Sequence, residues 1–436
     1  MSRSLTIALV AAATLAACVA DPEDDGVATV SLALEGAGPP GVGWVTDVQR
    51  TRIHGDTHHQ AFTLTLGASA NARIRLHRIV RERAPWLPRS TRGGVMLLHG
   101  DFSSFGTNFA PVTVEPTGTP GLAVWLADQG FDVWGFDRRW ALTPADGDTS
   151  DFGDMGVVQE LDDVGRALVA ARAVRVATGS GAERLHLLGF SRGGLLAYAA
   201  ASLDAARPPL LRQIKGLVAL DVWGVIPPED AAGRSAVCDS AFFEQLDLDA
   251  GVVDSPNGFF RNVGARSQAN PDGASPFPGF TNRELFLFIA GQTYNIFPVT
   301  PFYHLAAGEV VDGAVTHLTA SPEPAIAAWF ATAAPHQSLR EAADTDAMWC
   351  GDGSAPITLD LARIRVPLLY LGAAGGYGDH GLYTTTLVGS TDVTTRVVRR
   401  FPVGGEDQDV GHGDLLFARD AVDLAWRPLA AWLAAR

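Results

Sequence analysis

A serine with a glycine two residues before it and another two residues after it is the clearest candidate for chemistry in this chain. It stands in the segment Gly189-Phe190-Ser191-Arg192-Gly193, between the apolar run RLHLL and the alanine-rich run LLAYAAASLDAA. A serine held on a sharp turn between a strand and a helix can act as a nucleophile. The glycines fit such a turn, because backbone segments approach each other there too closely for a side chain. The pattern therefore predicts that Ser191 is a catalytic nucleophile.

A nucleophilic serine needs a general base, and the base needs an acid that orients it. Beyond residue 350 the chain has two histidines: His412, in the loop VGHGDLL after the last predicted strand, and His380, which directly adjoins an aspartate. We expect His412 to be the base. We expect Asp379 to be the acid, because it follows the apolar run VPLLYLGA in a loop rich in glycine. Asp221, at the end of the run KGLVALD, is the alternative acid.

Attack on a carbonyl group also needs donors for the negative charge that forms on its oxygen, and backbone N–H groups held in place serve this purpose. The residue after the nucleophile, Arg192, is expected to supply one N–H group. Asp101 is expected to supply the second, from the segment His99-Gly100-Asp101-Phe102 at the end of a predicted strand. We expect His99 to brace this loop rather than to act as a base.

Apolar runs that predict strands alternate with runs that predict helices over much of the chain. The alternation of apolar and polar residues in QAFTLTL and ARIRLHRIV predicts antiparallel strands near the start of the fold. The later runs GGVMLLHG, FDVWGFD, RLHLLGF and KGLVALDVW are typical of buried parallel strands. We expect helices between them and one closing helix in LLFARDAVDLAWRPLAAWLAA. This order predicts an α/β fold, a mostly parallel sheet with helices on both faces.

One long segment interrupts this alternation. Residues 44–223 and 356–436 are expected to form the α/β core, whereas residues 224–355 are too long for a bare loop and are predicted to form a cap domain. The cap holds about half of the 21 phenylalanines, and some of these are expected to line an apolar pocket while most form the core of the cap. It also holds Cys238 and Cys350, which can form a disulfide in an oxidising compartment.

The N-terminus, residues 1–18, is typical of an export signal, with an early arginine, an apolar run of about a dozen residues and then small residues. Its end, Leu15-Ala16-Ala17-Cys18, resembles the bacterial lipobox, in which the cysteine becomes the lipidated first residue of the mature protein. An ordinary secretory signal is the alternative. Residues 19–43 are acidic and then rich in proline and glycine, which is typical of a flexible tether. Because Val19 follows the cysteine, the resemblance implies the outer membrane rather than the inner.

The composition excludes some functions. The chain has 436 residues, of which 47% are hydrophobic and 19% charged, and its formal net charge is -15. These values are typical of a globular protein with a large core, and the negative charge argues against a nucleic-acid partner. The His and Asp clusters within residues 54–59 and 146–154 lack the pattern of a metal site, so no metal is expected. No cofactor is expected either, because the reaction of a serine with a histidine and an acid needs none.

Several of these segments together resemble the α/β-hydrolase superfamily: the strand that ends at His99-Gly100, the run GFDVWGFDRR, the serine motif, and then Asp379 and His412. GFDVW with a charged loop after it is similar to the acid-lipase branch, although Phe190 replaces the histidine often found before the serine. The likeness spans residues 93–436 apart from most of the cap. It implies the α/β-hydrolase fold and the chain order serine, acid, histidine.

The resemblance implies hydrolysis of a carboxylic ester, and the aromatic cap favours a hydrophobic one. The expected partners are a small-molecule or lipid-like ester and, through a lipid on Cys18, a membrane. Acyl transfer, peptide cleavage or C–C cleavage would use the same three residues. A non-catalytic binding module on the cell surface is the alternative of a different class. The complete set of serine, acid and histidine favours an enzyme.

Overall fold

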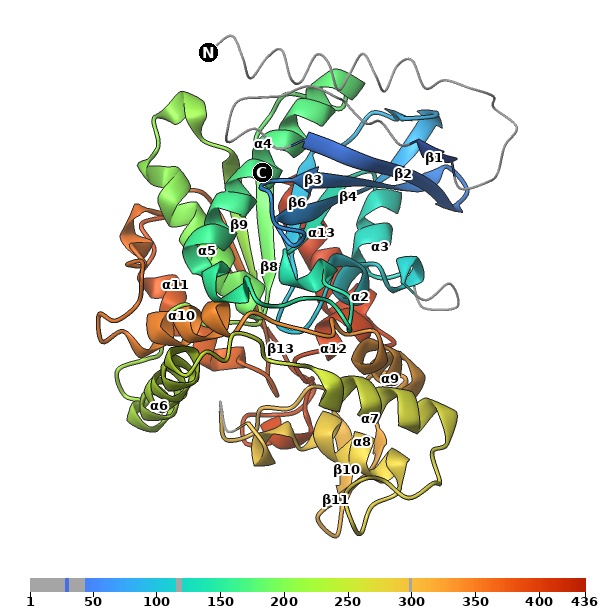
Figure 1. Cartoon of the computed structure of the whole chain (residues 1–436), viewed down its shortest axis with the longest axis vertical. Helices are drawn as coiled ribbons and strands as arrows, with labels where there is room; N and C mark the ends of the chain where they lie inside the picture. Colours follow the sequence, from blue (N-terminus) through green and yellow to red (C-terminus); the bar gives the residue numbers. More distant parts are fainter. Residues whose placement is uncertain (1–27, 31–43, 115–119, 298–299) are drawn as a thin grey trace.

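A computed structural model describes residues 28–30, 44–114, 120–297 and 300–436 (Figure 1). The export signal, Cys18 and most of the expected tether lie outside the described residues. Within the described part, none of the helices combines the length and the apolar character needed to cross a membrane.

One large twisted sheet forms the centre of the molecule, with its strands in the order β1-β2-β3-β4-β7-β6-β8-β9-β12-β13. The strands from Trp44 onward pair antiparallel, as predicted, and are β2 (Trp44–His54), β3 (Thr57–Thr65) and β4 (Arg73–Ala84), with β5 (Leu87–Pro88) beside β4. The short strand β1 (Ala28–Val30) lies within the segment predicted to be a flexible tether, and because it pairs antiparallel with β2, that prediction is wrong for these three residues. The parallel strands are β6 (Gly94–Leu98), β7 (Asp132–Asp137), β8 (Leu185–Phe190), β9 (Ile214–Leu220), β12 (Leu368–Ala373) and β13 (Val393–Val398). The predicted mostly parallel sheet is confirmed.

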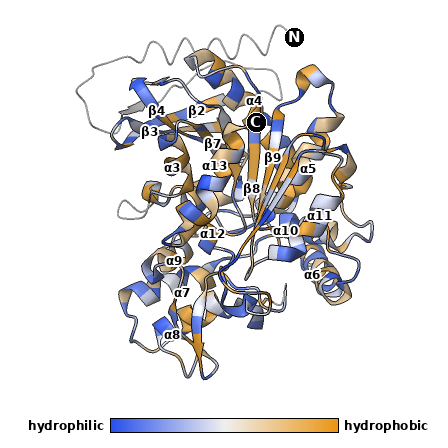
Figure 2. Ribbon diagram, turned by 180° about the vertical axis from the view of Figure 1, so that it is seen from behind, coloured by the Kyte–Doolittle hydropathy of each residue, from blue (hydrophilic) through white to orange (hydrophobic). Residues whose placement is uncertain are grey.

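Helices cover both faces of this sheet, so the central strands are buried on both sides (Figure 2). In β6, Val95 and Leu97 belong to one hydrophobic cluster, together with residues of α3 (Leu122–Asp128) and α13 (Arg427–Ala434). Met96 and Leu98 belong to the other, together with α4 (Val157–Thr178) and α5 (Arg192–Ala206). The shorter helices are α2 (Phe105–Phe109), α11 (Leu382–Thr386) and α12 (Asp414–Phe417). Successive residues of a strand point to opposite faces, which explains the continuous apolar runs of the sequence.

The predicted single closing helix is wrong. The segment forms α12, an extended residue at Ala418, a π-helical turn at Val422–Trp426 and then α13. Pro428 lies at the start of α13, directly after the π-helical turn, and the helical backbone continues through this junction.

Residues 224–355 leave the sheet after β9 and return to it at β12. They form α6 (Ala231–Asp249), α7 (Gly258–Ala269), α8 (Asn282–Gly291), the hairpin β10 (Gly308–Val311) and β11 (Ala314–Leu318), α9 (Glu323–Ala331) and α10 (Leu339–Cys350). We call this segment the insertion. It occupies the lower end of the molecule in Figure 1. Its role as a cap over a substrate stays a prediction.

Helix α10 is bound tightly to the core. Three of its acidic side chains each contact a group outside the insertion: Glu341 accepts from the Arg138 guanidinium (2.6 Å), Asp344 from the Val157 N–H (2.9 Å) and Asp346 from the Arg192 guanidinium (2.9 Å). Buried charges need such partners, because an unpaired charge away from water is costly. This part of the insertion is therefore fixed relative to the sheet.

A disulfide between Cys238 and Cys350 joins α6 to α10, with Cα atoms 4.8 Å apart. The predicted possible pairing is confirmed. Because α10 is itself bound to the core, the disulfide also holds α6 in place.

Replacing both cysteines, as Cys238→Ala with Cys350→Ala, is expected to lower the free energy of unfolding by about 2–5 kcal/mol, because the bridge closes a long loop. The two cysteines are 112 residues apart in the chain. Denaturant titration of both proteins in oxidising buffer measures the difference. Unchanged stability would contradict the prediction.

Candidate active site

Ser191 lies on a tight turn between β8 and α5. Its backbone angles are φ 56° and ψ -134°, in a region that residues with a side chain rarely occupy. A Cβ atom on Gly189 would lie 2.0 Å from the carbonyl oxygen of Gly193, and one on Gly193 would lie 2.4 Å from that of His99. No side chain fits at either glycine. The motif therefore forms the sharp strand-to-helix turn that the sequence predicts.

The loop after β6 packs directly against Ser191. A Cβ atom on Gly100 would lie only 3.0 Å from the Ser191 Cβ. Asp101 and Arg192, the expected sources of backbone donors, line the same cavity as Ser191. Arg192 is the first residue of α5, where a backbone N–H has no partner within the helix. The two residues also contact each other, since the Arg192 Nε donates to the Asp101 carboxylate at 2.8 Å.

The insertion holds this loop from the other side. The Gln337 Nε2 donates to Asp101 Oδ1 at 2.7 Å, and its Oε1 accepts from the Phe102 N–H at 2.9 Å. Burial alone would raise the pKa of the Asp101 carboxyl, yet the neighbouring Arg192 lowers that pKa, so the carboxylate stays charged. A charged Asp101 keeps its bonds to Arg192 and Gln337, and these bonds fix the loop beside Ser191.

His412 pairs with Asp221, the acid that the sequence offered as the alternative. The His412 Nδ1 lies 2.6 Å from Asp221 Oδ2, and both side chains are buried. Because a carboxylate only accepts hydrogen bonds, Nδ1 is the donor in this pair, and a neutral ring then has Nε2 as its acceptor. His412 lines the cavity together with Ser191. The ring is thereby prepared to accept a proton on its other nitrogen.

The expectation that Asp379 orients His412 is wrong. The Asp379 side chain is 52% exposed and binds the Arg399 guanidinium at 2.7 and 2.9 Å. Its loop contributes backbone rather than a carboxylate to the site: the N–H group of Gly378 donates to Asp221 Oδ1 at 3.1 Å. The aspartate after β12 therefore points to solvent, while the aspartate after β9 reaches the histidine.

The Asp221 carboxylate is completely surrounded by donors. Besides the His412 ring, it accepts from the backbone N–H groups of Ala373 (2.8 Å), Gly378 (3.1 Å) and Tyr377 (3.2 Å). A Cβ atom on Gly376 would lie 2.1 Å from Oδ2, so this position has no room for a side chain. The glycine-rich loop that follows β12 thus serves to wrap the carboxylate.

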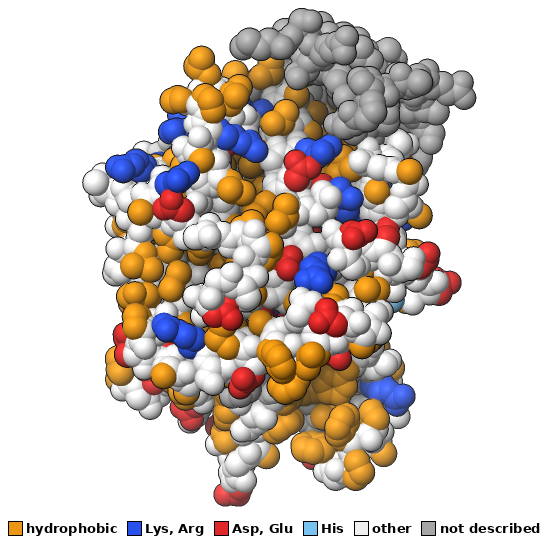
Figure 3. Space-filling model, turned by 60° about the vertical axis from the view of Figure 1, so that its left-hand side comes forward, with side chains coloured by type: hydrophobic (Ala, Val, Ile, Leu, Met, Phe, Trp, Pro, Cys, Tyr) orange, Lys and Arg blue, Asp and Glu red, His pale blue; other side chains and the backbone are white. Residues whose placement is uncertain are grey.

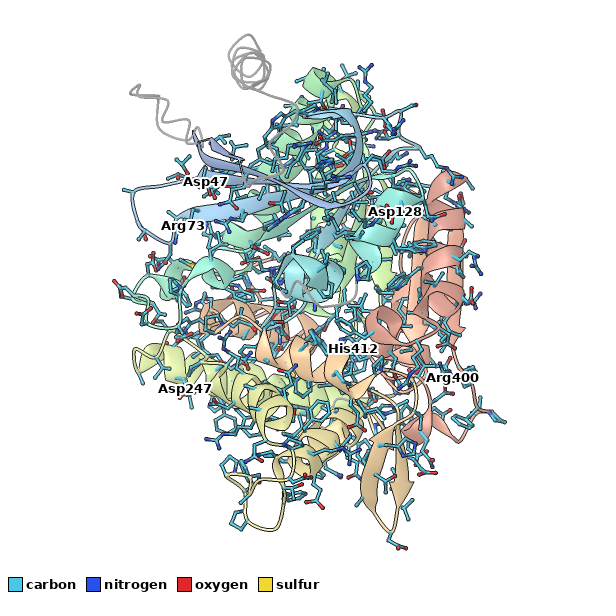
Figure 4. The ribbon with its side chains drawn as sticks, turned by 90° about the vertical axis from the view of Figure 1, so that its right-hand side faces the viewer. Asp47, Arg73, Asp128, Asp247, Arg400 and His412 are labelled. Carbon is cyan, nitrogen blue, oxygen red and sulfur yellow. A yellow bond between two sulfur atoms is a disulfide. The ribbon has the colours of Figure 1, made fainter. Side chains whose placement is uncertain are left out.

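The loop that carries His412 is held by the insertion and by Phe190, the residue before Ser191. The His412 N–H donates to the His304 carbonyl at 2.9 Å, and the next N–H, of Gly413, donates to Leu305 at 2.7 Å. The Phe190 ring stacks on the His412 ring with centroids 4.4 Å apart. In Figure 4, His412 lies between the sheet and the helices of the insertion.

His99, the histidine expected to brace its loop, is buried, and its Nδ1 lies 2.9 Å from the Gly100 carbonyl oxygen. Burial lowers the pKa of His99 to about 3, so the ring is neutral. The Arg138 guanidinium donates to the His99 carbonyl at 2.5 Å. These contacts fit a bracing role.

A cavity of about 580 Å³ lies between the core and the insertion and contains Ser191 and His412 in its wall. Most of the wall is apolar. Its aromatic members are Phe102, Phe190, Trp223, Phe259, Phe260, Phe297, Tyr303, Trp329, Phe330, Trp349 and Tyr377. A cavity with an apolar wall and a few polar groups is typical of a site for a small organic ligand.

The clusters of histidine and aspartate noted in the sequence make hydrogen bonds and ion pairs within the protein. His59 contacts His77 at 2.8 Å, and Asp56 binds the guanidinium group of Arg81 at 2.9 Å. Among the residues that the structure describes, no group of three or more His, Cys, Asp or Glu is placed to hold a metal ion.

The sequence matches no known protein-family model and no curated protein, but solved structures resemble the chain. A candidate lipase from Sulfolobus solfataricus superposes with a TM-score of 0.61 at 18% identity, covering 87% of this chain and 95% of that one. The chain has the α/β-hydrolase fold.

Two further structures are similar at lower scores. One is a soluble variant of monoglyceride lipase from Saccharomyces cerevisiae in complex with a substrate analogue, with a TM-score of 0.48, 12% identity, and coverage of 89% of this chain and 95% of that one. The other is a carboxyl esterase from Bacillus coagulans in complex with glycerol, with a TM-score of 0.42, 12% identity, and coverage of 86% and 98%. At such identities the likeness concerns the fold, and the reaction must be argued from the site.

Sequence reasoning missed several residues that position the site. Gln337 and His304 act from the insertion, far along the chain from the residues they contact, and no local pattern marks them. Asp221 could have been preferred from the sequence, because it directly follows strand β9. Strand β9 lies beside β8, and Ser191 directly follows β8. In the α/β-hydrolase fold of this chain, the serine and the acid come from neighbouring strands.

Asp221→Asn is expected to slow the labelling of Ser191 by a fluorophosphonate probe by about 10³–10⁴-fold, because an amide in that position favours the wrong tautomer of the histidine. Asp379→Asn is the matched control. It should stay within about twofold of the wild type, because it only removes an exposed ion pair. Labelling rates measured by mass spectrometry decide. A large loss in the control with none in Asp221→Asn would reinstate Asp379.

Proposed function

We propose that the protein hydrolyses carboxylic esters through Ser191, His412 and Asp221. The observation that carries the proposal is the buried contact between His412 and Asp221, at the wall of a cavity that also contains a serine on a strained turn. A serine, a histidine and an acid in this relation form the set used for acyl transfer from esters. The lipases and the esterase among similar structures are consistent with this reaction class.

The reaction has two halves. In the first, His412 Nε2 takes the proton of Ser191 Oγ as Oγ attacks the ester carbonyl carbon, and Asp221 stabilises the positive ring that results. The backbone N–H groups of Asp101 and Arg192 bind the negative oxygen of the tetrahedral intermediate. When this intermediate collapses, the bond to the alcohol breaks and His412 gives its proton to the leaving oxygen.

The second half repeats these steps with water. His412 removes a proton from a water molecule, which attacks the carbonyl carbon of the acyl-enzyme. The same N–H groups bind the new negative oxygen. Collapse of this intermediate releases the carboxylic acid, and the proton held by His412 returns to Ser191 Oγ.

The shape of the cavity favours a substrate with an apolar acyl group. Phe259 and Phe297 both line the cavity and are partly exposed, at 39% and 46%, so they lie where the cavity meets solvent. Phe260 and Phe330 continue the aromatic wall inward. Figure 3 shows hydrophobic side chains around a hollow at the end of the molecule formed by the insertion. Burial of an apolar chain against such rings is favourable.

The first test is hydrolysis of p-nitrophenyl esters with acyl chains from two to sixteen carbons. We expect activity in the wild type, faster on longer chains than on acetate, and a loss in kcat of at least ~10³-fold in Ser191→Ala. Equal activity in Ser191→Ala would refute the serine mechanism. A folded wild type that hydrolyses none of these esters would refute ester hydrolysis.

The protein is also proposed to be held at a bacterial outer membrane by a lipid on Cys18, on the strength of the segment Leu15-Ala16-Ala17-Cys18. A single acyl chain gives only marginal membrane binding, so stable anchoring takes a second acyl chain or another membrane-binding signal.

Cys18→Ala is expected to move the full chain from the membrane fraction to the soluble fraction of a bacterial host and to abolish incorporation of labelled palmitate. Ester hydrolysis in the soluble fraction should persist, because Cys18 precedes the folded part of the chain. Palmitate incorporation that survives the substitution would contradict the anchor.

A further inference from the structure

Part of the substrate cavity lies between two facing helices of the insertion. Helix α6 contributes Gly233, Ala236, Val237, Ser240 and Glu244, and helix α10 contributes Ala342, Asp346 and Trp349. Residues three, four and seven positions apart lie on one face of a helix, so each helix turns a single face to the cavity. Most of these α6 side chains are small, which leaves space between the helices. We call this space the α6–α10 arm.

Glu244 places a carboxyl oxygen without a hydrogen-bond partner in this arm. Its Oε2 atom is buried, and among the residues that the structure describes it has no hydrogen-bond partner. A buried acceptor without a donor is costly, and the cost is higher for a charged group. Glu244 lines the cavity, so a ligand in the arm can supply the missing partner.

The charges around Glu244 are predominantly negative. The groups that act on it are Asp346, Arg192, Asp101 and, most weakly, Asp247. The Arg192 guanidinium already binds two other carboxylates, Asp101 through Nε (2.8 Å) and Asp346 through Nη1 (2.9 Å). Three carboxylates in the cavity wall therefore surround one guanidinium. A positively charged ligand would offset the excess.

Aromatic rings complete the surroundings of the arm. The Trp223 ring lies edge-on to Tyr377, with centroids 5.0 Å apart, and the Trp349 Nε1 donates to the Trp223 carbonyl at 3.0 Å. The Arg192 guanidinium already lies over the Trp349 ring, 5.0 Å from its centroid. Aromatic faces attract cations, including quaternary ammonium groups.

We propose that the α6–α10 arm selects esters whose alcohol part carries a positively charged nitrogen, with Glu244 as the residue that determines this specificity. The inference rests on the proposed ester hydrolysis and adds the class of alcohol. A neutral hydroxyl group would give Oε2 a hydrogen bond but would leave the excess negative charge in place. A cation supplies the opposite charge close to the carboxylate.

The titration of Glu244 agrees with this geometry. Burial raises the pKa of Glu244 to about 8. The pKa is raised, so the carboxyl is mostly protonated below pH 8 and gains its charge as the pH rises through that value. Affinity for a permanent cation should accordingly rise between pH 6 and pH 9, and binding below pH 8 should release protons.

The experiment compares choline with 3,3-dimethyl-1-butanol, which has the same shape and no charge. Binding of each alcohol to the folded enzyme is followed by tryptophan fluorescence, and hydrolysis of their butyrate esters is measured in parallel. We expect the wild type to prefer the cation by about tenfold, the scale of a partly desolvated cation–π and charge interaction.

Glu244→Gln keeps the size of the side chain and removes its charge, and should reduce this preference to about one. Asp247→Asn is the matched control, since it removes the same charge from an exposed position of the same helix (Figure 4). The Asp247→Asn variant should keep most of the preference for the cation. High salt should weaken the preference of the wild type only in part, because a buried charge is screened less than an exposed one.

Equal affinity of the wild type for the two alcohols would overturn the inference even if both esters are hydrolysed. Tighter binding of glycerol than of choline would also overturn it, because it would assign the arm to neutral hydroxyl groups. Selective binding of choline that Glu244→Gln abolishes, without hydrolysis of either ester, would support the arm's preference and count against ester hydrolysis.

Discussion

The buried carboxylate of Asp221 is the interaction on which the site depends. A carboxylate with no exposed surface is tolerated only when donors surround it, and here three backbone N–H groups and the His412 ring do so. The loop after β12 must therefore take one conformation, in which Gly376 and Gly378 let the backbone close around the acid. Strands β9 and β12 are adjacent in the sheet, and this adjacency is what brings loop and carboxylate together.

The insertion also holds loops of the site in place. Its residues His304 and Leu305 hold the backbone of the His412 loop, and Gln337 holds the loop beside Ser191. The ion pair between Arg138 and Glu341 ties its last helix to the core at the same end of the sheet. The insertion thus holds the loops beside Ser191 and around His412, besides forming part of the wall of the cavity.

The sequence predicts the features of this molecule that follow from local patterns. Alternating apolar residues predict the antiparallel strands, continuous apolar runs predict the parallel ones, and two glycines around Ser191 predict the turn. The choice between Asp221 and Asp379 is of another kind, since both follow an apolar strand. Asp221 directly follows its strand, which favours it, but the packing of the loop after β12, which turns Asp379 toward Arg399, is what decides between them. The break in the closing segment near Ala418 likewise depends on tertiary contacts, because its helical pattern continues on both sides.

The position of the insertion in the chain has a consequence for how this protein can change over evolution. In many proteins a loop that recognises the ligand can vary freely while the catalytic residues stay on a separate scaffold. Here the insertion begins just after Asp221, and its own backbone carries the bonds that hold His412. Mutations that reshape the cavity between α6 and α10 are tolerable only if residues 304–305 and 337 keep their places. New substrate preferences should therefore arise by exchange of side chains that face the cavity, such as the small residues of α6, and not by gain or loss of whole segments.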